Sequence, residues 1–371
     1  MSIPPTLLPE GLRDRLPPEA DAAARLVRHT LDSIRSWGYE RVAPPLAEFE
    51  EALVGRLKSA SAQDLLRFVD PVSRRSLALR PDITTQVGRI AATRMAHRPR
   101  PLRLCYGGPV VKLHATQLRP EREMTQVGAE LIGNDSVAAA AEIVQVSIAA
   151  LERAGITGIT VDLTLPDLVD TLAAGPFPLE PGRIAEVRAL LDAKDAGGLA
   201  ALGATHYLPL IDATGPFDGA VEKLRAIDAG GALASRIAAL EAIAAPLSGR
   251  AAVTLDPSER HGFEYQSWFG FSLFVDGLTG EIGRGGSYTV LHGDGREEPA
   301  IGFSIYTDPL IELAVDRGPR KRLFLPLGTD AIVAEKMRSE GWITVAALDE
   351  NCDAAALGCT HRLAGNSAVP A

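Results

Sequence analysis

The spacing of apolar residues predicts two long helices in the first 155 residues. Apolar side chains recur at helical spacing from about 19 to 37, and Gly38 follows where a helix is expected to end. A second apolar run over 135–154 starts with Asp135 and Ser136 and stops before Gly155, which are helix start and stop signals. Strands are expected at 39–42, 76–79, 102–106 and 123–132.

A helix boundary is also expected just after residue 80. Pro81 disfavours the helical conformation for Arg80, and Asp82 is a good N-cap for a helix that reaches about Met95. A cap is enough to explain Asp82. The sharper alternative is that its carboxylate contacts the amino group of a ligand.

The second half alternates a helical segment with further strands. Ala- and Leu-rich helices fill about 165–250 and are predicted to form an insertion. Strands are expected at 252–255, 263–275 and 287–291, with a glycine-rich turn at 283–286, and 301–315 starts as a strand and continues as a helix. After about 320 the pattern reads strand, helix, strand.

These elements predict an α+β fold. Long strands without crossover helices between them favour an antiparallel sheet flanked by helices. We therefore predict a core domain over 1–318, which includes the helical insertion, and a small C-terminal α/β domain over 319–371.

Composition narrows the classes of function. The net charge of −9 gives no sign of a nucleic-acid partner such as tRNA, because phosphate binding needs clustered Lys and Arg. The three cysteines form neither a CxxC motif nor a disulfide framework, so no metal site and no cofactor is expected. With no signal peptide and no membrane span expected, the sequence predicts a cytoplasmic protein that does not bind a membrane.

The strand at 123–132 carries the most informative pattern. Side chains alternate between the two faces of a strand, so Arg122, Gln126, Gly128 and Glu130 share one face. That face offers donors, acceptors and both signs of charge, as a zwitterionic small molecule requires. Glycine inside a strand often marks the close approach of a ligand. A solvent-exposed sheet face would show the same pattern.

Two further segments have more than one interpretation. Residues 261–271 are rich in aromatic side chains, and a core strand explains most of them, although Tyr265 and Gln266 carry polar tips that a binding site could use. The run at 283–288 resembles a phosphate-binding loop only superficially, and a tight hairpin or close packing fits it better.

Taken in order, these segments resemble the histidyl-tRNA synthetases and their non-catalytic relatives, the regulatory subunits of ATP phosphoribosyltransferase. The resemblance runs from about residue 8 to residue 313, and its motifs belong to the class II aminoacyl-tRNA synthetases. The matching segments are 8–45 (motif 1), 79–84 (LRPD-x-T), 106–133 (motif 2), 261–271, 285–288 (GGSY) and the stretch from 300 onward (motif 3).

The resemblance implies that the positions that handle ATP have been lost. Lys112 stands where a synthetase has the arginine that grips the α-phosphate, and lysine lacks the planar two-pronged donor. His261 and Pro309 stand where the family has two further arginines. Losing three such positions around one triphosphate removes most of the electrostatic stabilisation of amino-acid activation.

The resemblance also implies that the amino-acid site is kept. By analogy, four residues hold the amino group and the imidazole of L-histidine: Asp82, Thr84, Gln126 and Glu130. Four others line the site: Arg122, Tyr265, Gln266 and Tyr288. Gln266 departs from the tyrosine of the family.

The expected function is therefore regulatory rather than catalytic. The resemblance implies a partnership with the short-form catalytic subunit of ATP phosphoribosyltransferase, self-association as a dimer through the synthetase-like core, and feedback inhibition of histidine biosynthesis by histidine. The alternatives are a histidine-activating enzyme that resembles histidyl-tRNA synthetase and a free-standing histidine-binding protein.

Overall fold

The structure is a computed structural model that describes residues 7–53, 65–114, 120–260, 267–316, 318 and 321–371. The chain forms two compact units, Met1–Val315 and Asp316–Ala371. This division falls slightly before the boundary expected after residue 318. Each unit has its own hydrophobic core and is described by itself.

A nine-stranded sheet organises the larger unit. The neighbours across it are antiparallel, except for two parallel pairs, β1 with β5 and β7 with β9. The mainly antiparallel sheet agrees with the predicted α+β class. The strands, in spatial order, are β1 (Glu40–Arg41), β5 (Leu102–Val111), β6 (Glu123–Ile132), β12 (Glu297–Tyr306), β11 (Gly283–Leu291), β10 (Gly270–Val275), β7 (Ile159–Thr164), β9 (Ala252–Leu255) and β8 (Gly215–Pro216).

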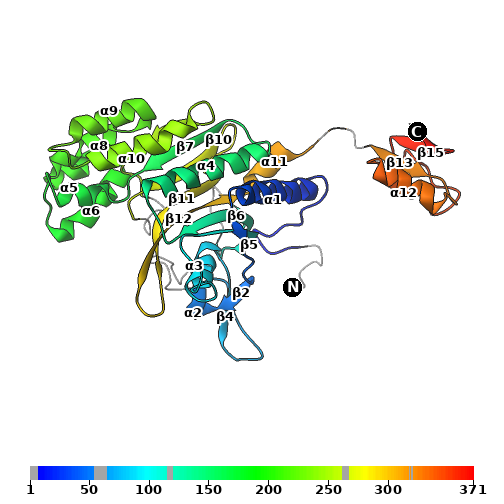
Figure 1. Ribbon diagram of the computed structural model, residues 1–371, viewed down its shortest axis with the longest axis horizontal. Helices are drawn as coiled ribbons and strands as arrows, with labels where there is room; N and C mark the ends of the chain where they lie inside the picture. The colour runs from blue at the N-terminus through cyan, green and yellow to red at the C-terminus, as the bar shows by residue number, and fades with distance from the viewer. Residues whose placement is uncertain (1–6, 54–64, 115–119, 261–266, 317, 319–320) are drawn as a thin grey trace. The chain divides into compact units, whose positions relative to one another are not determined.

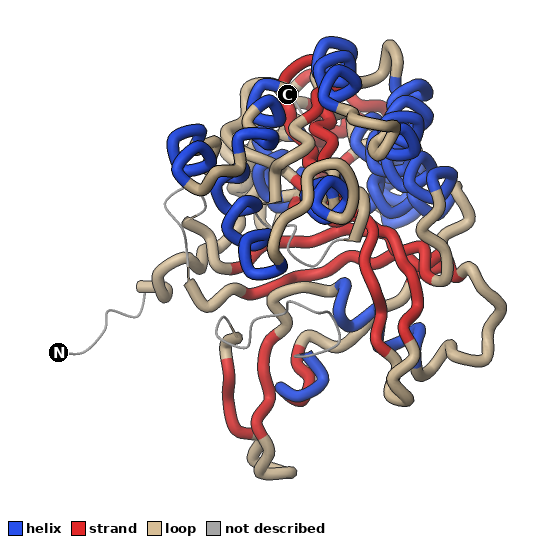
Figure 2. Tube along the Cα trace, turned by 90° about the vertical axis from the view of Figure 1, so that its left-hand side faces the viewer, coloured by secondary structure: helices blue, strands red, loops and turns tan. Residues whose placement is uncertain are grey.

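Helices lie on both faces of this sheet (Figures 1 and 2). The long helices α1 (Glu19–Ser36) and α4 (Val137–Arg153) pack on each other and on one face, where they cover the main core. The opposite face carries α3 (Thr84–Ala92), which closes a second, smaller core together with β5, β6 and β11. Both long helices confirm the predictions made from apolar spacing.

The predicted helical insertion is present and gathers beside α4 in Figure 1. Its helices add side chains to the main core, among them Leu191, Leu199 and Leu240. They are α5 (Leu168–Ala173), α6 (Pro181–Asp192), α7 (Ala196–Ala201), α8 (Pro209–Asp212), α9 (Phe217–Ile227) and α10 (Ala234–Ala244), with 3-10 turns at Thr205–Tyr207 and Ala245–Leu247.

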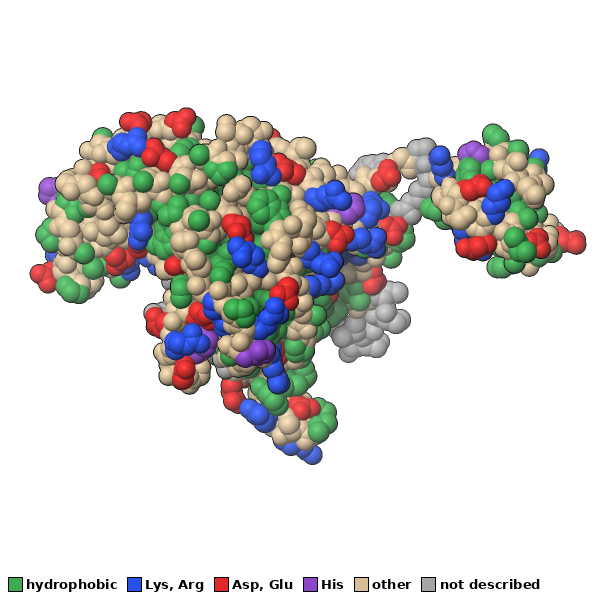
Figure 3. Space-filling view, in the orientation of Figure 1, with side chains coloured by type: hydrophobic (Ala, Val, Ile, Leu, Met, Phe, Trp, Pro, Cys, Tyr) green, Lys and Arg blue, Asp and Glu red, His purple; other side chains and the backbone are tan. Residues whose placement is uncertain are grey.

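Smaller elements complete the larger unit. A three-stranded sheet of β2 (Ala47–Phe49), β4 (Ser76–Leu79) and β3 (Arg67–Val69) lies next to α2 (Glu50–Leu53). After β12 come the 3-10 turn Asp308–Leu310 and α11 (Ile311–Ala314), which packs on α1. Basic side chains gather around α1 on the face that Figure 3 shows, and Arg28, His29 and Arg35 of this helix are exposed.

Three expectations about these elements were wrong. The glycine-rich segment at 283–286 is not a turn, because it forms the first half of β11 between β10 and β12. The strand expected over 263–275 starts only at Gly270, and residues 263–266 lie outside the described part of the chain. Helix α3 ends at Ala92, and its N-cap is Ile83 rather than Asp82.

The smaller unit is a four-stranded sheet with one helix. The two strands and the helix that come first along the chain were predicted, whereas the two strands at its C-terminal end were missed. Its core contains Leu323, Leu325, Met337 and Leu363. In spatial order the strands are β14 (Ile343–Ala346), β13 (Arg322–Leu325), β15 (His361–Ala364) and β16 (Ser367–Pro370), and the helix is α12 (Ala331–Ser339).

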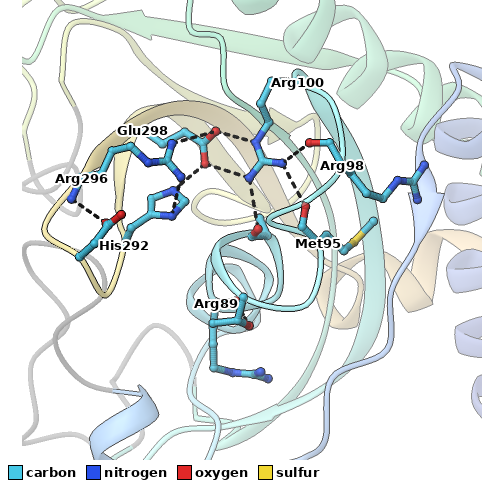
Figure 4. Close-up of polar contacts among 10 residues, drawn as sticks. Arg89, Met95, Arg98, Arg100, His292, Arg296 and Glu298 are labelled. Atoms are coloured by element: carbon cyan, nitrogen blue, oxygen red, sulfur yellow. Dashed lines mark hydrogen bonds and ion pairs between the residues drawn. The ribbon is translucent and has the colours of Figure 1, made fainter.

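Ion pairs and hydrogen bonds of charged side chains connect the β11–β12 hairpin to the C-terminal end of α3 (Figure 4). Arg100 donates to both carboxylate oxygens of Glu298 and also to the carbonyls of Ala91 and Met95. Glu298 is 4% exposed and is bonded to His292 at 2.8 Å. Burial would raise the pKa of Glu298, but the bonds and charges of Arg100 and His292 hold it below its usual value.

Glu298→Gln is expected to lower the free energy of unfolding by about 2 kcal/mol, because it removes a buried charge and turns an amide donor toward Arg100. Calorimetric unfolding of the full chain measures the loss. Glu40→Gln is the matched control, since Glu40 forms the same two-pronged pair with Arg98 at the surface. Equal losses in both variants would contradict the role of burial.

Candidate functional site

The two faces of β6 have different surroundings. Val127, Ala129 and Leu131 belong to the main core under α1 and α4, whereas Met124 belongs to the smaller core on the α3 side. Glu130 shares the face of Met124, and its carboxylate bonds Tyr106 and Tyr288, which lie in that smaller core. The predicted alternation is therefore confirmed, and the polar face is not exposed to solvent as the simpler alternative required.

Glu130 is almost completely buried, with 1% of its surface exposed. Its carboxylate accepts hydrogen bonds from the hydroxyls of Tyr106 at 3.0 Å and Tyr288 at 2.7 Å. Burial raises the pKa of Glu130 to about 8, although the hydrogen bonds from Tyr288, Thr84 and Tyr106 oppose the shift. At neutral pH the group is mostly a neutral acid.

Tyr106 links this acid to two hydroxyl groups. Its Oη lies 3.0 Å from Thr84 Oγ1 and 3.0 Å from Ser304 Oγ. The tyrosine is completely buried, and burial raises the pKa of its hydroxyl well above the usual value, with the nearby charge of Glu130 acting in the same direction. Tyr106 therefore stays a hydrogen-bonding phenol.

Gln126 connects the sheet to the start of α3. Its Nε2 donates to Asp82 Oδ2 at 2.8 Å and to Ser304 Oγ at 2.7 Å, and its Oε1 accepts from the backbone N–H of Ile83 at 2.9 Å. Asp82 Oδ1 accepts from the backbone N–H of Thr84 at 2.6 Å. Asp82 thus stabilises the turn before α3, and it stands one residue before the N-cap of that helix, Ile83.

These contacts define a polar cluster in which every member is joined to another by a hydrogen bond. Five of its members were predicted, and Tyr106 and Ser304 were missed. The polar cluster consists of Asp82, Thr84, Tyr106, Gln126, Glu130, Tyr288 and Ser304.

Glycines continue the row of Glu130 across the sheet. Gly302, Gly286 and Gly270 are paired in succession on β12, β11 and β10, and Gly302 is paired with Glu130. These positions carry no side chain, so the backbone there is open to close approach. A methyl group on Gly302 would lie 1.7 Å from Glu130 Oε2, so this glycine is required by the acid itself.

The other predicted residues are placed differently. Arg122 does not join the polar cluster, because its guanidinium donates to the carbonyls of Lys112 and Glu10 and its stem lies against Gly11. Its contact with a ligand stays a prediction. Tyr265 and Gln266 lie outside the described residues, and so does His261.

The described residues offer no metal-binding centre. Among them, no group of three or more His, Cys, Asp and Glu side chains is placed to hold a metal ion. Within the same ranges, no helix combines the length and apolar character needed to cross a membrane.

Comparison with known proteins places this chain in a family. The profile of the histidyl-tRNA synthetases matches residues 11–310. An ATP phosphoribosyltransferase regulatory subunit from Rhodospirillum centenum is 43% identical over 97% of this chain and 95% of its own length. The chain belongs to the family of ATP phosphoribosyltransferase regulatory subunits.

Two solved structures share the fold of this chain. The ATP phosphoribosyltransferase regulatory subunit/histidyl-tRNA synthetase from Bacillus halodurans C has a TM-score of 0.80 and 25% identity, over 96% of this chain and 97% of its own. A chain of the ATP phosphoribosyl transferase (HisG:HisZ) complex from Thermotoga maritima has a TM-score of 0.60, over 77% of this chain and 97% of its own. At 14% identity, that second likeness shows the fold alone.

Two of the positions that were expected to have lost ATP handling, Lys112 and Pro309, lie just beyond the ends of strands. Lys112 follows β5, and its Nζ lies 5.6 Å from the centre of the Tyr306 ring. Pro309 lies in the 3-10 turn after β12 and offers neither a charge nor a donor. Next to it, Asp308 accepts from Arg15 and from the backbone N–H of Thr125.

The raised pKa of Glu130 predicts a pH dependence of stability. Between the ordinary value of 4.5 and about 8, the folded state binds more protons at this group than the unfolded state, so stability falls as pH rises. Glu130→Gln does not titrate. Its stability relative to the natural chain is therefore expected to increase over this window, by on the order of 3 kcal/mol.

Calorimetric unfolding between pH 5 and pH 8 measures this difference. Glu142→Gln is the control. The hydrogen bond from Arg103 lowers the pKa of Glu142, so this carboxylate contributes its full stabilisation above pH 4.5 and adds no pH dependence over this window. Parallel pH profiles for the natural chain and Glu130→Gln would contradict a neutral Glu130.

Proposed function

We propose that this chain is the non-catalytic regulatory subunit of an ATP phosphoribosyltransferase and that its polar cluster binds L-histidine as the feedback signal. The carrying observation is the identity of 43% over nearly the whole chain to a protein of that name. The catalytic subunit would perform the transfer, and this subunit would make the complex responsive to histidine. A cytoplasmic location stays a prediction.

The chemistry of the polar cluster supports a ligand with an amino group and an imidazole. Asp82 offers a half-buried carboxylate to an ammonium group, held in place by Gln126 and Thr84. Glu130 offers a carboxyl group that can donate or accept a proton near neutral pH, which matches an imidazole nitrogen. Beyond Gly302, whose side is filled by Glu130 itself, Gly286 and Gly270 carry no side chain, which would let a flat ring approach the sheet there.

The positions that a synthetase needs for ATP support the absence of amino-acid activation. Lys112 retains a charge but not the planar fork, and Pro309 retains neither. An oxyanion or phosphate clamp built from arginine therefore has no counterpart at the described motif positions.

Regulation requires that histidine distinguish two states of the complex. A ligand that binds the active and inactive assemblies equally shifts neither, whatever its affinity. A coupling of roughly 1–3 kcal/mol between the histidine site and the catalytic site is typical of allosteric proteins. Partnership with the catalytic subunit and self-association as a dimer both belong to this proposal.

Co-purification tests the regulatory role directly. The chain is expected to form a complex with a short-form catalytic subunit, to support ATP phosphoribosyltransferase activity, and to make that activity sensitive to histidine. The same preparation is expected to show no histidine-dependent ATP–pyrophosphate exchange. Robust exchange would instead establish a histidine-activating enzyme.

Glu130→Ala is expected to weaken histidine binding roughly tenfold or more, because it removes the hydrogen-bonding group assigned to the imidazole. Titration calorimetry measures the affinity, and gel filtration with the catalytic subunit checks that assembly is intact. Glu142→Ala is the control, since this acid belongs to α4 and bonds Tyr39 and Arg103 instead. Unchanged affinity in Glu130→Ala would remove Glu130 from the site.

A further inference from the structure

Arg80 is a buried cation that the site described so far does not use. It is 5% exposed and lies between β4 and α3, two residues before Asp82. Among the described residues, no carboxylate forms an ion pair with it. Burying a guanidinium in this way is costly unless its charge is balanced nearby and its donors are satisfied.

The donors of Arg80 are directed to the backbone and to one amide. Its Nε donates to the carbonyl of Pro109 at 2.8 Å, and Nη1 donates to the carbonyl of Pro44 at 2.9 Å and lies 3.4 Å from Gln86 Oε1. The side chain therefore joins the outer edge of β5, the turn before β2, and α3. A methyl group on Gly108 would lie 2.4 Å from Nη2, so this fit also depends on glycine.

The backbone of Arg80 is fixed as firmly as its side chain. Its N–H donates to the carbonyl of Leu46 at 3.0 Å, and its carbonyl accepts from the N–H of Val111 at 3.0 Å. Because Pro81 and Asp82 follow directly, these bonds set the position from which the carboxylate of Asp82 reaches Gln126.

Burial lowers the pKa of Arg80, and the nearby charges of Glu48 and Asp82 oppose that shift. Glu48 already has a cation of its own, because Arg89 of α3 donates to both its oxygens. Among the described residues, Asp82 accepts hydrogen bonds from the Gln126 amide and the Thr84 backbone N–H and forms no ion pair, and its charge also acts to raise the pKa of Glu130 and of Tyr106. Of the two acids near Arg80, Asp82 is thus the one without an ion pair among the described residues.

We propose that Arg80 is a positioning residue of the histidine site that acts through Asp82. It holds the turn that carries Asp82 and places a positive charge near this carboxylate. The inference rests on the proposed binding of histidine. It assigns a role in ligand recognition to a residue that does not touch the ligand.

A double-mutant cycle tests the coupling, with histidine affinity measured by titration calorimetry on the full chain. Arg80→Met is expected to weaken binding by tenfold or more when Asp82 is present, and by less than about threefold in the Asp82→Asn background. Arg80→Lys keeps the charge and is expected to bind within about threefold of the natural chain. Arg89→Met, which removes the other α3-linked arginine, is expected to change affinity by less than about twofold.

Several results would overturn the inference. Equal losses from Arg80→Met in both backgrounds would mean that Arg80 only maintains the fold, and losses from Arg80→Lys as large as those from Arg80→Met would show that its charge is not responsible. If circular dichroism shows Arg80→Met to be unfolded, Arg80→Gln takes its place in the cycle, with the same expectation. Absence of histidine binding to the natural chain would defeat the proposed function itself, whereas binding without coupling would defeat only the role of Arg80.

Discussion

An acid buried inside a sheet must be surrounded by groups that hydrogen-bond it, and Glu130 imposes this requirement on the centre of the molecule. Tyr106 and Tyr288 approach it from β5 and β11, and the strand between β6 and β11 has glycine at position 302 because the carboxylate occupies the space of a side chain. The requirement extends outward through Ser304 and Gln126 to the start of α3. The register of four strands and the placement of one helix thus converge on a single side chain.

The spacing of apolar and polar residues was sufficient to predict the two long helices and the polar face of β6. Helices α1 and α4 have strong apolar periodicity, and strict alternation along β6 correctly grouped Gln126 with Glu130. Tyr106 and Ser304 were missed because they reach the cluster only through the pairing of β5 and β12 with β6, and strand register depends on contacts between distant segments. The glycines at 283–286 predict a turn but form a strand. A glycine-rich sequence is the same for a flexible turn and for a strand whose neighbours leave no room for side chains.

The residues proposed to bind histidine and the positions expected to handle ATP in the synthetases differ in their place in the sheet. Gln126 and Glu130 sit in the middle of a central strand and are completely or almost completely buried. Lys112 and Pro309 follow the ends of β5 and β12, where the chain leaves the sheet. A mid-strand polar residue has partners that would be left unsatisfied by its replacement, whereas a residue at a strand end can change with little effect on its neighbours.

The fit of Gly302 against Glu130 has a consequence for how such a core diverges. Replacing Gly302 alone creates a clash with the carboxylate, and replacing Glu130 alone removes a hydrogen-bond partner of both Tyr106 and Tyr288. Because each single substitution is expected to lower stability, the two residues are expected to persist together wherever the register of β6 and β12 is kept.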